Sequence, residues 1–600
     1  MATNCPSPAD KGIEPQLVIG IDFGTTGSGY AFQTRADFKS DRLRIYENLQ
    51  WGRAKTQYKT PTCLLVNPER TDSWFGDEAE QEYIKLRPRD QPNNWFFFRN
   101  FKMQIYGKEI TTDMVLTSEN GNELPALFVF SESIKWMRNH VLTYLERTNC
   151  RYLEQMTKWV LTVPAIWTEG AKQLMRKAAQ RAGIQRQNLC IALEPEVAAV
   201  YCTTAEANPP DDPRRDFDRT LPSGPGTTNM IVDMGGGTVD ITTIQVKKDG
   251  TMKQIHMAAG GPAGGNKVDE KFFRFLSDIL GASVWRKFCQ DFPVEFYDFR
   301  MSFETSKRNL LPKLRHNRTR DEFPIFIPGT IIQEFEREQE KDIATALRQN
   351  EMTRDKVEFE FGKLIFRGEI LRQMMNSSLE EIIGYVTHVA KEVKALGRPI
   401  HAAILVGGFA SSDFMNDEMK SIIQERLGIL VKRPTHCEMA VLRGAVLFGH
   451  NENILTSRVV RMTYGIGVTM PYSSKYPKDK KFTMDGNAYV SGVFAPHVFR
   501  GQEVKIDEWI SANEYYPLEQ NQKEVVIYVF ASESKDTKLT DEEDCKCIGK
   551  FEVSFGEGRR GILLNSASTE ISFNFGRTEL IIRAKDTKTG NEVYESLTLK

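Results

Sequence analysis

Apolar residues repeat at helical spacing in two clear stretches of this 600-residue chain. One is 169–182, where Thr168 is placed to cap the first turn and Gly183 to end the helix. The other is 369–396, in which isoleucine, methionine, leucine and valine recur along one side. Both stretches lie in the part of the chain before Gly449, and both predict packed amphipathic helices.

Beyond about Gly449 the pattern changes to short β-type runs between polar turns. Two of these runs alternate apolar and polar residues at period two, as a strand with one buried face does. This texture predicts a separate antiparallel β domain with no helical domain behind it. The runs lie at 525–530, 551–555, 571–575 and 579–582.

One sequence pattern occurs twice. Residues 17–32 and 230–244 each hold an apolar strand ending in aspartate, then an apolar residue, a turn rich in glycine and threonine, and a second strand. The two aspartates are Asp22 and Asp233. Copies this far apart predict the duplicated halves of one fold.

The chemistry of the repeated turn points to a polyphosphate. Glycine lets a phosphate approach closely, and a tight turn can aim successive backbone N–H groups at an anion. Thr25, Thr26 and Thr238 add hydroxyl donors, while Asp22 and Asp233 suit a magnesium ion held through water. Two such hairpins facing each other would hold a polyphosphate from both sides. Either turn alone could be an ordinary glycine-rich hairpin, and neither is a P-loop.

A third element favours a nucleotide. The apolar run 401–406 leads into Gly407, Gly408 and Phe409, and a helix is predicted from Ser412 or the next residue. A strand, two glycines and a helix N-terminus allow a base or ribose to lie flat against the backbone. Alone, this element is equally typical of an ordinary connection between a strand and a helix.

The composition argues against nucleic-acid binding, a membrane span and secretion. The chain carries 79 Lys and Arg against 80 Asp and Glu, a net charge of −1, so no overall field attracts nucleic acid. No apolar stretch approaches the ~20 residues of a membrane span, and residues 1–14 lack the apolar core of a secretory signal. Nine scattered cysteines indicate reduced thiols. We expect a cytoplasmic protein, with the nucleus as an alternative.

The three elements, in this order, resemble the nucleotide-binding signature of the actin, hexokinase and 70-kDa heat-shock ATPase superfamily. The strand 161–167 and the following segment 193–201, with its E-P-x-x-A-A pattern, resemble the heat-shock branch, and the details resemble its 70-kDa protein 12 members. The resemblance implies an α/β fold: a duplicated ribonuclease-H-like (actin-like) two-lobed ATPase domain, then a smaller antiparallel β-sandwich, with no helical lid.

The same resemblance divides the chain into parts. We expect a disordered N-terminus at 1–14, ATPase lobe I at 15–228 with an insertion loop at about 205–228, lobe II at 229–450, a linker at 451–460 and a β-rich substrate- or partner-binding domain at 461–600.

The resemblance implies ATP or ADP with Mg²⁺ as cofactors. Lys102 would orient the attacking water and the γ-phosphate, and Glu194 would contact the metal's surroundings or couple them to the other domain. Asp240 would position water or a cation, while Asp22 and Asp233 would hold Mg²⁺ through water. These residues form the expected catalytic and metal set.

The nucleotide itself would contact glycines and hydroxyls of the three elements and a charged helix near 304. The expected contacts are Gly24, Thr25, Thr26, Gly235, Gly236, Gly237, Thr238, Glu304, Lys307, Arg308, Gly407, Gly408, Phe409 and Glu438. Two departures leave adenine selectivity open: Ser411 stands where the heat-shock branch has arginine, and Leu311 where it has a hydroxyl residue.

Three functions are compatible with these features. The first is a slowly hydrolysing, chaperone-like ATPase whose nucleotide state controls lobe closure and whose C-terminal β domain binds a protein or peptide client. The second is a nucleotide-gated scaffold with negligible turnover, because the linker 451–457 lacks the acidic, leucine-rich run of typical members. The third is a sugar or metabolite kinase, for which Asp240 is the one candidate base. The sequence leaves the oligomeric state open.

Overall fold

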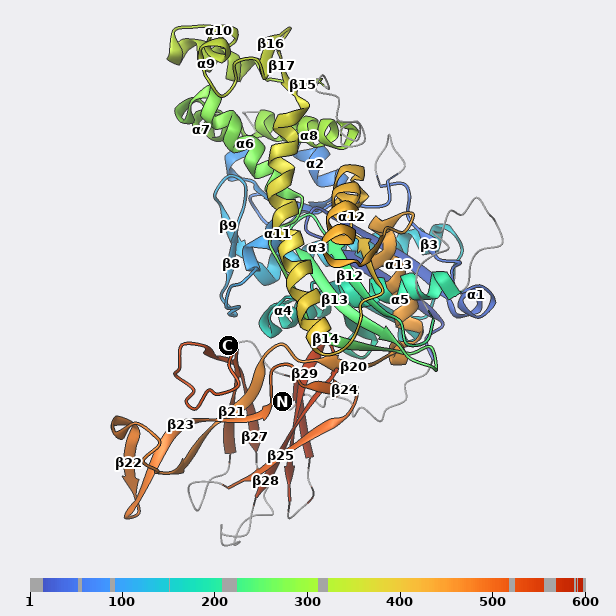
Figure 1. Cartoon of the computed structure of the whole chain (residues 1–600), viewed down its shortest axis with the longest axis vertical. Coiled ribbons are helices and arrows are strands. Elements are labelled where there is room, and N and C mark those ends of the chain that lie inside the picture. Colours follow the sequence, from blue (N-terminus) through green and yellow to red (C-terminus); the bar gives the residue numbers. More distant parts are fainter. Residues whose placement is uncertain are drawn as a thin grey trace.

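Two mixed sheets and the helices around them form the larger part of the molecule, and two further sheets lie at its C-terminal end (Figure 1). This computed structural model describes residues 14–51, 57–86, 92–150, 152–207, 224–310, 322–516, 524–554, 568–587, 590 and 592–596. No helix in these ranges is both long and apolar enough to cross a membrane.

The first sheet has the strand order β11-β10-β1-β2-β3. Its central strand β1 is buried at all seven positions, as expected for an apolar strand covered on both faces. β1 pairs with β2 antiparallel and with β10 parallel, and β10 pairs with β11 parallel. The strands are β1 (Leu17–Phe23), β2 (Gly27–Thr34), β3 (Tyr46–Glu47), β10 (Thr157–Val163) and β11 (Leu189–Leu193).

The second sheet repeats this arrangement in the order β19-β18-β12-β13-β14. Its central hairpin is again antiparallel, and its next two strands are again parallel to the first. The two copies of the sequence pattern therefore occupy equivalent places in two equivalent sheets. The strands are β12 (Thr228–Met234), β13 (Val239–Val246), β14 (Met252–Gly261), β18 (Ala402–Val406) and β19 (Leu430–Lys432), and β20 (Leu455–Val459) and β24 (Glu503–Lys505) extend the far edge.

Two helices, α5 (Glu194–Ala207) and α13 (Ala440–His450), pack between the sheets. They cross closely at Gly444, where an added Cβ would lie 1.8 Å from the carbonyl oxygen of Val197. Val18 and Ile231 bring residues of both sheets into the same hydrophobic core. This shared core holds the two repeated hairpins in a fixed relation.

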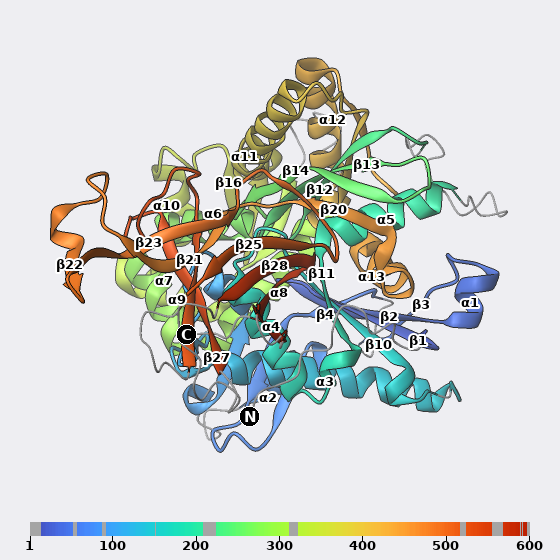
Figure 2. The same cartoon turned by 90° about the horizontal axis from the view of Figure 1, so that it is seen from below.

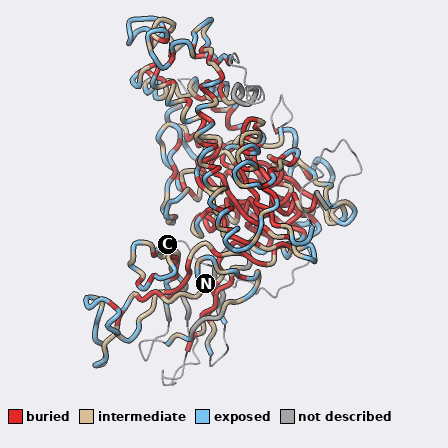
Figure 3. Tube along the Cα trace, in the orientation of Figure 1, coloured by how far each residue is buried: buried red, intermediate tan, exposed pale blue. Residues whose placement is uncertain are grey.

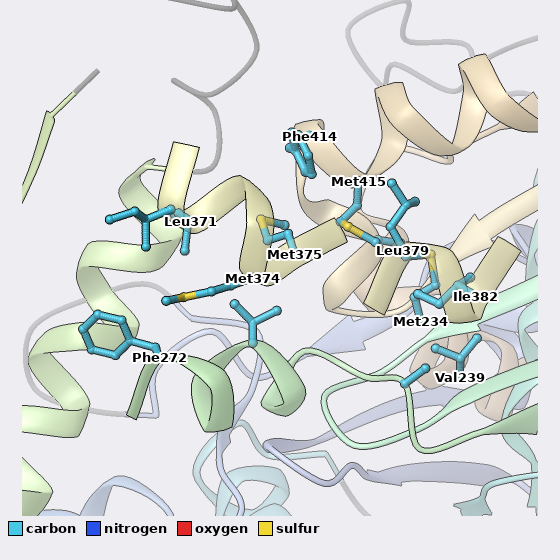
Figure 4. Close-up of a cluster of buried hydrophobic side chains, with 14 of the residues drawn as sticks. Met234, Val239, Phe272, Leu371, Met374, Met375, Leu379, Ile382, Phe414 and Met415 are labelled. Carbon is cyan, nitrogen blue, oxygen red and sulfur yellow. The ribbon is translucent and has the colours of Figure 1, made fainter. Parts of the chain in front are cut away.

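Further helices cover the outer faces of both sheets. On the first sheet lie α3 (Ala126–Arg147) and α4 (Glu169–Arg181), and the Thr168 side chain caps α4 as predicted by accepting from the Ala171 amide. On the second lie α6 (Asn266–Leu280), α11 (Gly368–Ala395) and α12 (Asp413–Leu427). Figure 4 shows α11 side chains among Phe272 of α6, Met415 of α12 and Met234 of β12. The helix predicted at 369–396 is thus confirmed.

Smaller elements extend from each sheet. Near the first are α1 (Arg35–Ser40), α2 (Asp77–Lys85), β4 (Thr60–Pro61), β5 (Cys63–Val66), β6 (Ser73–Phe75), β7 (Phe96–Arg99), β8 (Val115–Thr117) and β9 (Glu123–Pro125). At the top of Figure 1 are α7 (Ala282–Asp291), α8 (Pro293–Leu310), α9 (Gly329–Gln339), α10 (Ile343–Gln349), β15 (Glu322–Phe326), β16 (Val357–Glu360) and β17 (Lys363–Arg367).

The C-terminal strands form two sheets, ordered β22-β23-β21-β26-β27 and β25-β28-β29-β30, with a common hydrophobic core that includes Ile466, Val529 and Phe573. All pairs within them are antiparallel, as the sequence predicts. In Figure 2, which views the molecule from below, the C-terminal strands lie in front of the first two sheets. Figure 3 shows that buried residues are most concentrated in the first two sheets. The strands are β21 (Thr463–Pro471), β22 (Lys481–Met484), β23 (Asn487–Val498), β25 (Trp509–Tyr515), β26 (Glu524–Ser532), β27 (Cys545–Ser554), β28 (Thr569–Arg577), β29 (Glu579–Asp586) and β30 (Glu592–Ser596).

Candidate functional site

The turns of the two repeated hairpins touch each other. A Cβ added to Gly236 would lie 2.4 Å from the Thr26 hydroxyl oxygen, and one added to Gly237 would lie 2.8 Å from that of Thr25. Because glycine has no Cβ, the backbone of the second turn can approach the threonines of the first. The structure therefore brings together the glycines and hydroxyls that the sequence marks as phosphate contacts.

Four acidic residues are buried beneath these turns: Asp22, Glu194, Asp233 and Asp240 are each no more than 9% exposed. Asp233 and Asp240 are directly opposite in the β12–β13 pairing, and Asp22 occupies the position in β1 that Asp233 has in β12. Burial, together with the negative charges of Glu194, Asp240 and Asp22, raises the pKa of Asp233 well above its usual value. All four carboxyl groups thus belong to one electrostatic cluster.

Lys102 lies in the 3₁₀ turn Phe101–Ile105 and reaches into this cluster. Its ammonium group donates to Glu194 Oε1 at 2.8 Å and to the Phe23 carbonyl at 2.6 Å, and it lies 5.0 Å from the centre of the Trp167 ring. Burial raises the pKa of Glu194 to about 7, an effect that the charge of Lys102 opposes. The sequence around Lys102 is by itself typical of a surface lysine, but in the structure Lys102 is only 2% exposed.

Asp240 is fixed within the cluster by a backbone amide. Its Oδ1 accepts a hydrogen bond from the Ile166 amide at 3.0 Å. Burial raises the pKa of Asp240, while this amide and the Thr238 hydroxyl oppose the shift. The segment 161–167 and the second hairpin, which the sequence singles out separately, therefore meet at one carboxylate.

Lys59 also belongs to this site, and the sequence analysis missed it. Its ammonium group donates to Asp22 Oδ2 at 2.6 Å, while the Thr162 hydroxyl donates to Asp22 Oδ1 at 3.1 Å. Burial disfavours the charged lysine, but the charge and hydrogen bond of Asp22, together with the charges of Asp233 and Glu194, outweigh that effect and raise the pKa of Lys59. No motif surrounds Lys59. The two glycines of β2, Gly27 and Gly29, were the available signal, because they leave one strand face bare.

The third element closes the cluster from the second sheet. Gly407 has φ +92° at the end of β18, and a Cβ there would lie 2.4 Å from Asp233 Oδ1. The Phe409 ring lies 3.4 Å from the Cβ position of Gly265, at the start of α6. The strand, the glycines and the following helix occur as predicted, and Gly407 packs directly on Asp233 of the acidic cluster.

The predicted base-binding residues are only partly gathered there. Glu438 lies in the 3₁₀ turn Cys437–Met439, and the Gly407 amide donates to the Cys437 carbonyl next to it. The Ser411 carbonyl, by contrast, accepts from the guanidinium of Arg433 at 3.1 Å, so an arginine does lie beside this loop although it comes from another segment.

Glu304 is half-buried on α8, next to Phe303, whose ring stacks on Phe272 of α6 at 3.9 Å. The side chains of Lys307 and Arg308, further along α8, and the whole of Leu311 lie outside the described residues. The adenosine contacts assigned to this helix therefore stay predictions.

The donor set fits a magnesium ion accompanied by phosphates. When all four carboxyl groups are ionised, their charge exceeds that of the two lysines Lys59 and Lys102, and a hard cation would balance the excess. Within the described ranges, no group of three or more His, Cys, Asp or Glu side chains is arranged to hold a metal directly. A magnesium ion here would thus depend on water and on phosphate oxygens for most of its ligands.

Comparison with known proteins finds a family model and relatives that all belong to one family. The Hsp70 protein family model matches residues 18–284. Heat shock 70 kDa protein 12B of Homo sapiens is 30% identical, over 97% of this chain and 90% of that protein. Heat shock 70 kDa protein 12A of Mus musculus is 28% identical and that of Homo sapiens 27% identical, each over 96% of this chain and 90% of the relative. These alignments extend beyond the two mixed sheets into the C-terminal strands.

Proposed function

The chain belongs to the heat shock 70 kDa protein 12 branch of the Hsp70 family and has its actin-like ATPase fold, and we propose that it is a slowly hydrolysing, chaperone-like ATPase. The single observation that carries this proposal is the contact between the two hairpin turns above four buried carboxyl groups. A site with facing backbone amides, hydroxyls and buried acids suits a nucleotide's phosphates with their metal ion.

In the proposed reaction, water attacks the γ-phosphate of bound ATP in line with the leaving oxygen. A bound magnesium ion, held through water by Asp22 and Asp233, would balance the charge of the phosphates. Thr25, Thr26, Thr238 and the turn amides would orient the phosphates, and positioning would supply most of the rate.

Lys102 and Glu194 would act together on the attacking water. The Phe23 carbonyl and Glu194 hold the Lys102 ammonium in one place, so its charge is preorganised beside the phosphates. With a pKa of about 7, the Glu194 carboxyl can accept a proton at neutral pH. Asp240, fixed by the Ile166 amide, would hold the second side of the water site.

Contacts between the ATPase part and the C-terminal strands support coupling between nucleotide state and client binding. β20, which leads from one to the other, is paired with β14 in the second sheet. Arg458 in this strand binds both carboxylate oxygens of Glu196, at 2.9 and 2.7 Å. Glu196 lies two residues beyond Glu194 on α5, so a displacement of the linker strand would reach the acidic cluster through one helix.

The client would bind to the C-terminal strands, which we infer to be a β-sandwich that works without a helical lid. On β26, Val526 and Tyr528 are 44% and 50% exposed, while the alternate residues Ile527 and Val529 are buried. An exposed apolar stripe on a strand suits an extended peptide or a protein surface.

A scaffold with negligible turnover is the second candidate. It is favoured by the Lys59–Asp22 ion pair, because Asp22 then has both oxygens engaged within the protein. A kinase has less support, since Asp240 is already held by the Ile166 amide and the Thr238 hydroxyl.

Equilibrium binding of ATP and ADP with magnesium, followed by single-turnover phosphate release, separates these functions. Binding with phosphate release above the buffer rate supports the ATPase. Tight binding without release supports the scaffold, and phosphate transfer to a sugar supports the kinase. If neither nucleotide binds, the proposed function is wrong.

A further inference from the structure

Lys59 lies inside the site, and protein acceptors in the described ranges do not engage all the N–H donors of its ammonium group. Its one hydrogen-bond partner among the described residues is Asp22, at 2.6 Å, and its side chain is 22% exposed. An ammonium group has three N–H donors, so donors remain for a ligand. Lys102 differs, because it has two oxygen acceptors and the Trp167 ring around it and its side chain is 2% exposed.

The Lys59 side chain packs against the bare face of β2. On β2, a Cβ at Gly29 would lie 3.2 Å from Lys59 Cγ, and a Cβ at Gly27 would lie 3.5 Å from Lys59 Cβ. These two glycines point to the same face of the strand, since alternate residues share a face. A Cβ at Gly29 would crowd the aliphatic part of Lys59, whereas one at Gly27 would make an ordinary contact with it, so the lysine packs closely along this face of β2.

The ammonium group lies at the end of the site where the phosphates are expected. Asp22, its partner, lies at the end of β1, immediately before the turn that carries Thr25 and Thr26. The ammonium also interacts electrostatically with Asp233 and Glu194, so it lies within range of the whole acidic cluster. A monovalent cation built into the protein thus occupies the neighbourhood in which a nucleotide's metal ion would stand.

We propose that Lys59 is a resident cation of the nucleotide site: its ammonium binds the phosphates and replaces part of the charge neutralisation that magnesium supplies, so that this chain binds ADP without a divalent ion. The inference rests on the proposed function, because it requires that a nucleotide binds between the two hairpins. It adds Lys59 as a binding residue and removes the strict requirement for a divalent ion in ADP binding. A lysine serves here as a compact point charge, and its hydrogen bonds to phosphate are charge-assisted.

Calorimetric titration of ADP into the full chain, in magnesium buffer and in EDTA, tests the proposal. For the wild type we expect the Kd to rise less than about fivefold in EDTA. We expect Lys59→Met to bind ADP in magnesium buffer. In EDTA, its Kd should be about 50-fold higher than its own Kd in magnesium, a factor typical of a lost hydrogen bond to a charged group. Lys59→Arg, which keeps the charge, should behave like the wild type.

Two controls separate a phosphate contact from a structural effect. Lys287 is also partly buried and ion-paired, to Glu334 at 2.9 Å, but lies on α7 away from the site, so Lys287→Met should change nothing. Adenosine has no phosphates, so Lys59→Met should leave its Kd unchanged. An equal loss of adenosine and ADP affinity would show that Lys59 acts through folding, and would overturn the proposal.

The remaining outcomes of the ADP titrations separate the Lys59 proposal from the proposed function. If wild-type binding is lost in EDTA as completely as in Lys59→Met, magnesium is indispensable and the proposal is wrong, while the proposed function stands. If ADP binds under neither condition, both are wrong. Should Lys59→Met fail to fold, as judged by thermal unfolding, the wild-type and Lys59→Arg titrations still give the same decision.

Discussion

The ammonium group of Lys102 and the carboxylate of Glu194 are 2.8 Å apart although 92 residues separate them in the sequence. The lysine comes from a 3₁₀ turn after β7, and the glutamate begins α5. Neither residue is more than 9% exposed. A buried ion pair of this kind holds its charges in fixed positions, which is what stabilisation of a transition state requires.

Replacement of Lys102 should therefore remove turnover while leaving nucleotide binding largely intact. We expect Lys102→Met to slow single-turnover phosphate release by at least about 100-fold, the effect of losing one preorganised charged donor. Rapid-quench measurement with ATP in excess magnesium checks this. Lys287→Met is the matched control, and an unaltered rate in Lys102→Met would remove Lys102 from the mechanism.

The contact between the hairpin turns predicts that Gly236 does not tolerate a side chain. In Gly236→Ala the new Cβ would collide with Thr26, a stiff β-branched residue, so the turns must separate. We expect a loss of about 1–3 kcal/mol in stability, as for overpacked sites, and weaker ADP binding.

Two companion variants make the Gly236 result specific. Gly384, in α11, has open space around its Cβ position, so Gly384→Ala should be neutral or slightly stabilising in thermal unfolding. Thr26→Gly combined with Gly236→Ala should restore part of the lost stability. If Gly236→Ala unfolds at the wild-type temperature, the turns do not meet as described.

The linker strand should depend on its buried ion pair. Arg458 and Glu196 are 8% and 1% exposed, so Arg458→Met leaves a carboxylate buried without its partner. We expect a loss of about 3–5 kcal/mol in unfolding free energy, measured by urea titration. The double variant Arg458→Met with Glu196→Gln should lose much less, whereas equal losses would show that the pair is not coupled.

His497 should make the C-terminal strands sensitive to acid. Its ring packs 4.6 Å from that of Phe573 and its Nε2 lies 2.8 Å from the Tyr515 hydroxyl, and burial lowers its pKa to about 4. In the unfolded chain the pKa is near 6.5, so the unfolded state binds more protons between these values. The contribution of His497 to stability is therefore present above pH 6.5 and lost as the pH falls towards 4.

Urea unfolding followed at pH 7 and pH 5 measures this dependence. His497→Gln keeps a polar group for Tyr515 but does not titrate, so its stability should change less between the two pH values than that of the wild type. A variant with the same pH dependence as the wild type would contradict the assignment.

Local patterns were sufficient to predict the hairpins, the helix capped by Thr168 and the strand before Gly407, because each depends on neighbours in the sequence. The repetition of the aspartate and the glycines also predicted that Asp22 and Asp233 share one site. Lys59 was missed because its role depends on the pairing of β4 with β2, which no local pattern encodes.

The Arg458–Glu196 pair was missed for the same reason, since 262 residues separate its members. The position of Arg433 beside Ser411 could not be predicted either. The sequence shows that an arginine is missing at position 411, but not that another segment brings one nearby. Long-range side-chain pairs of this kind are fixed by tertiary packing rather than by periodicity.

The most direct test of the central claim is a crystal structure of the full chain with ADP and Mn²⁺, whose anomalous scattering locates the ion. The account predicts phosphates between the Thr25–Thr26 and Gly236–Gly237 turns, with the ion within one water molecule of Asp22 and Asp233. A nucleotide bound elsewhere, or an ion remote from both carboxylates, would contradict it.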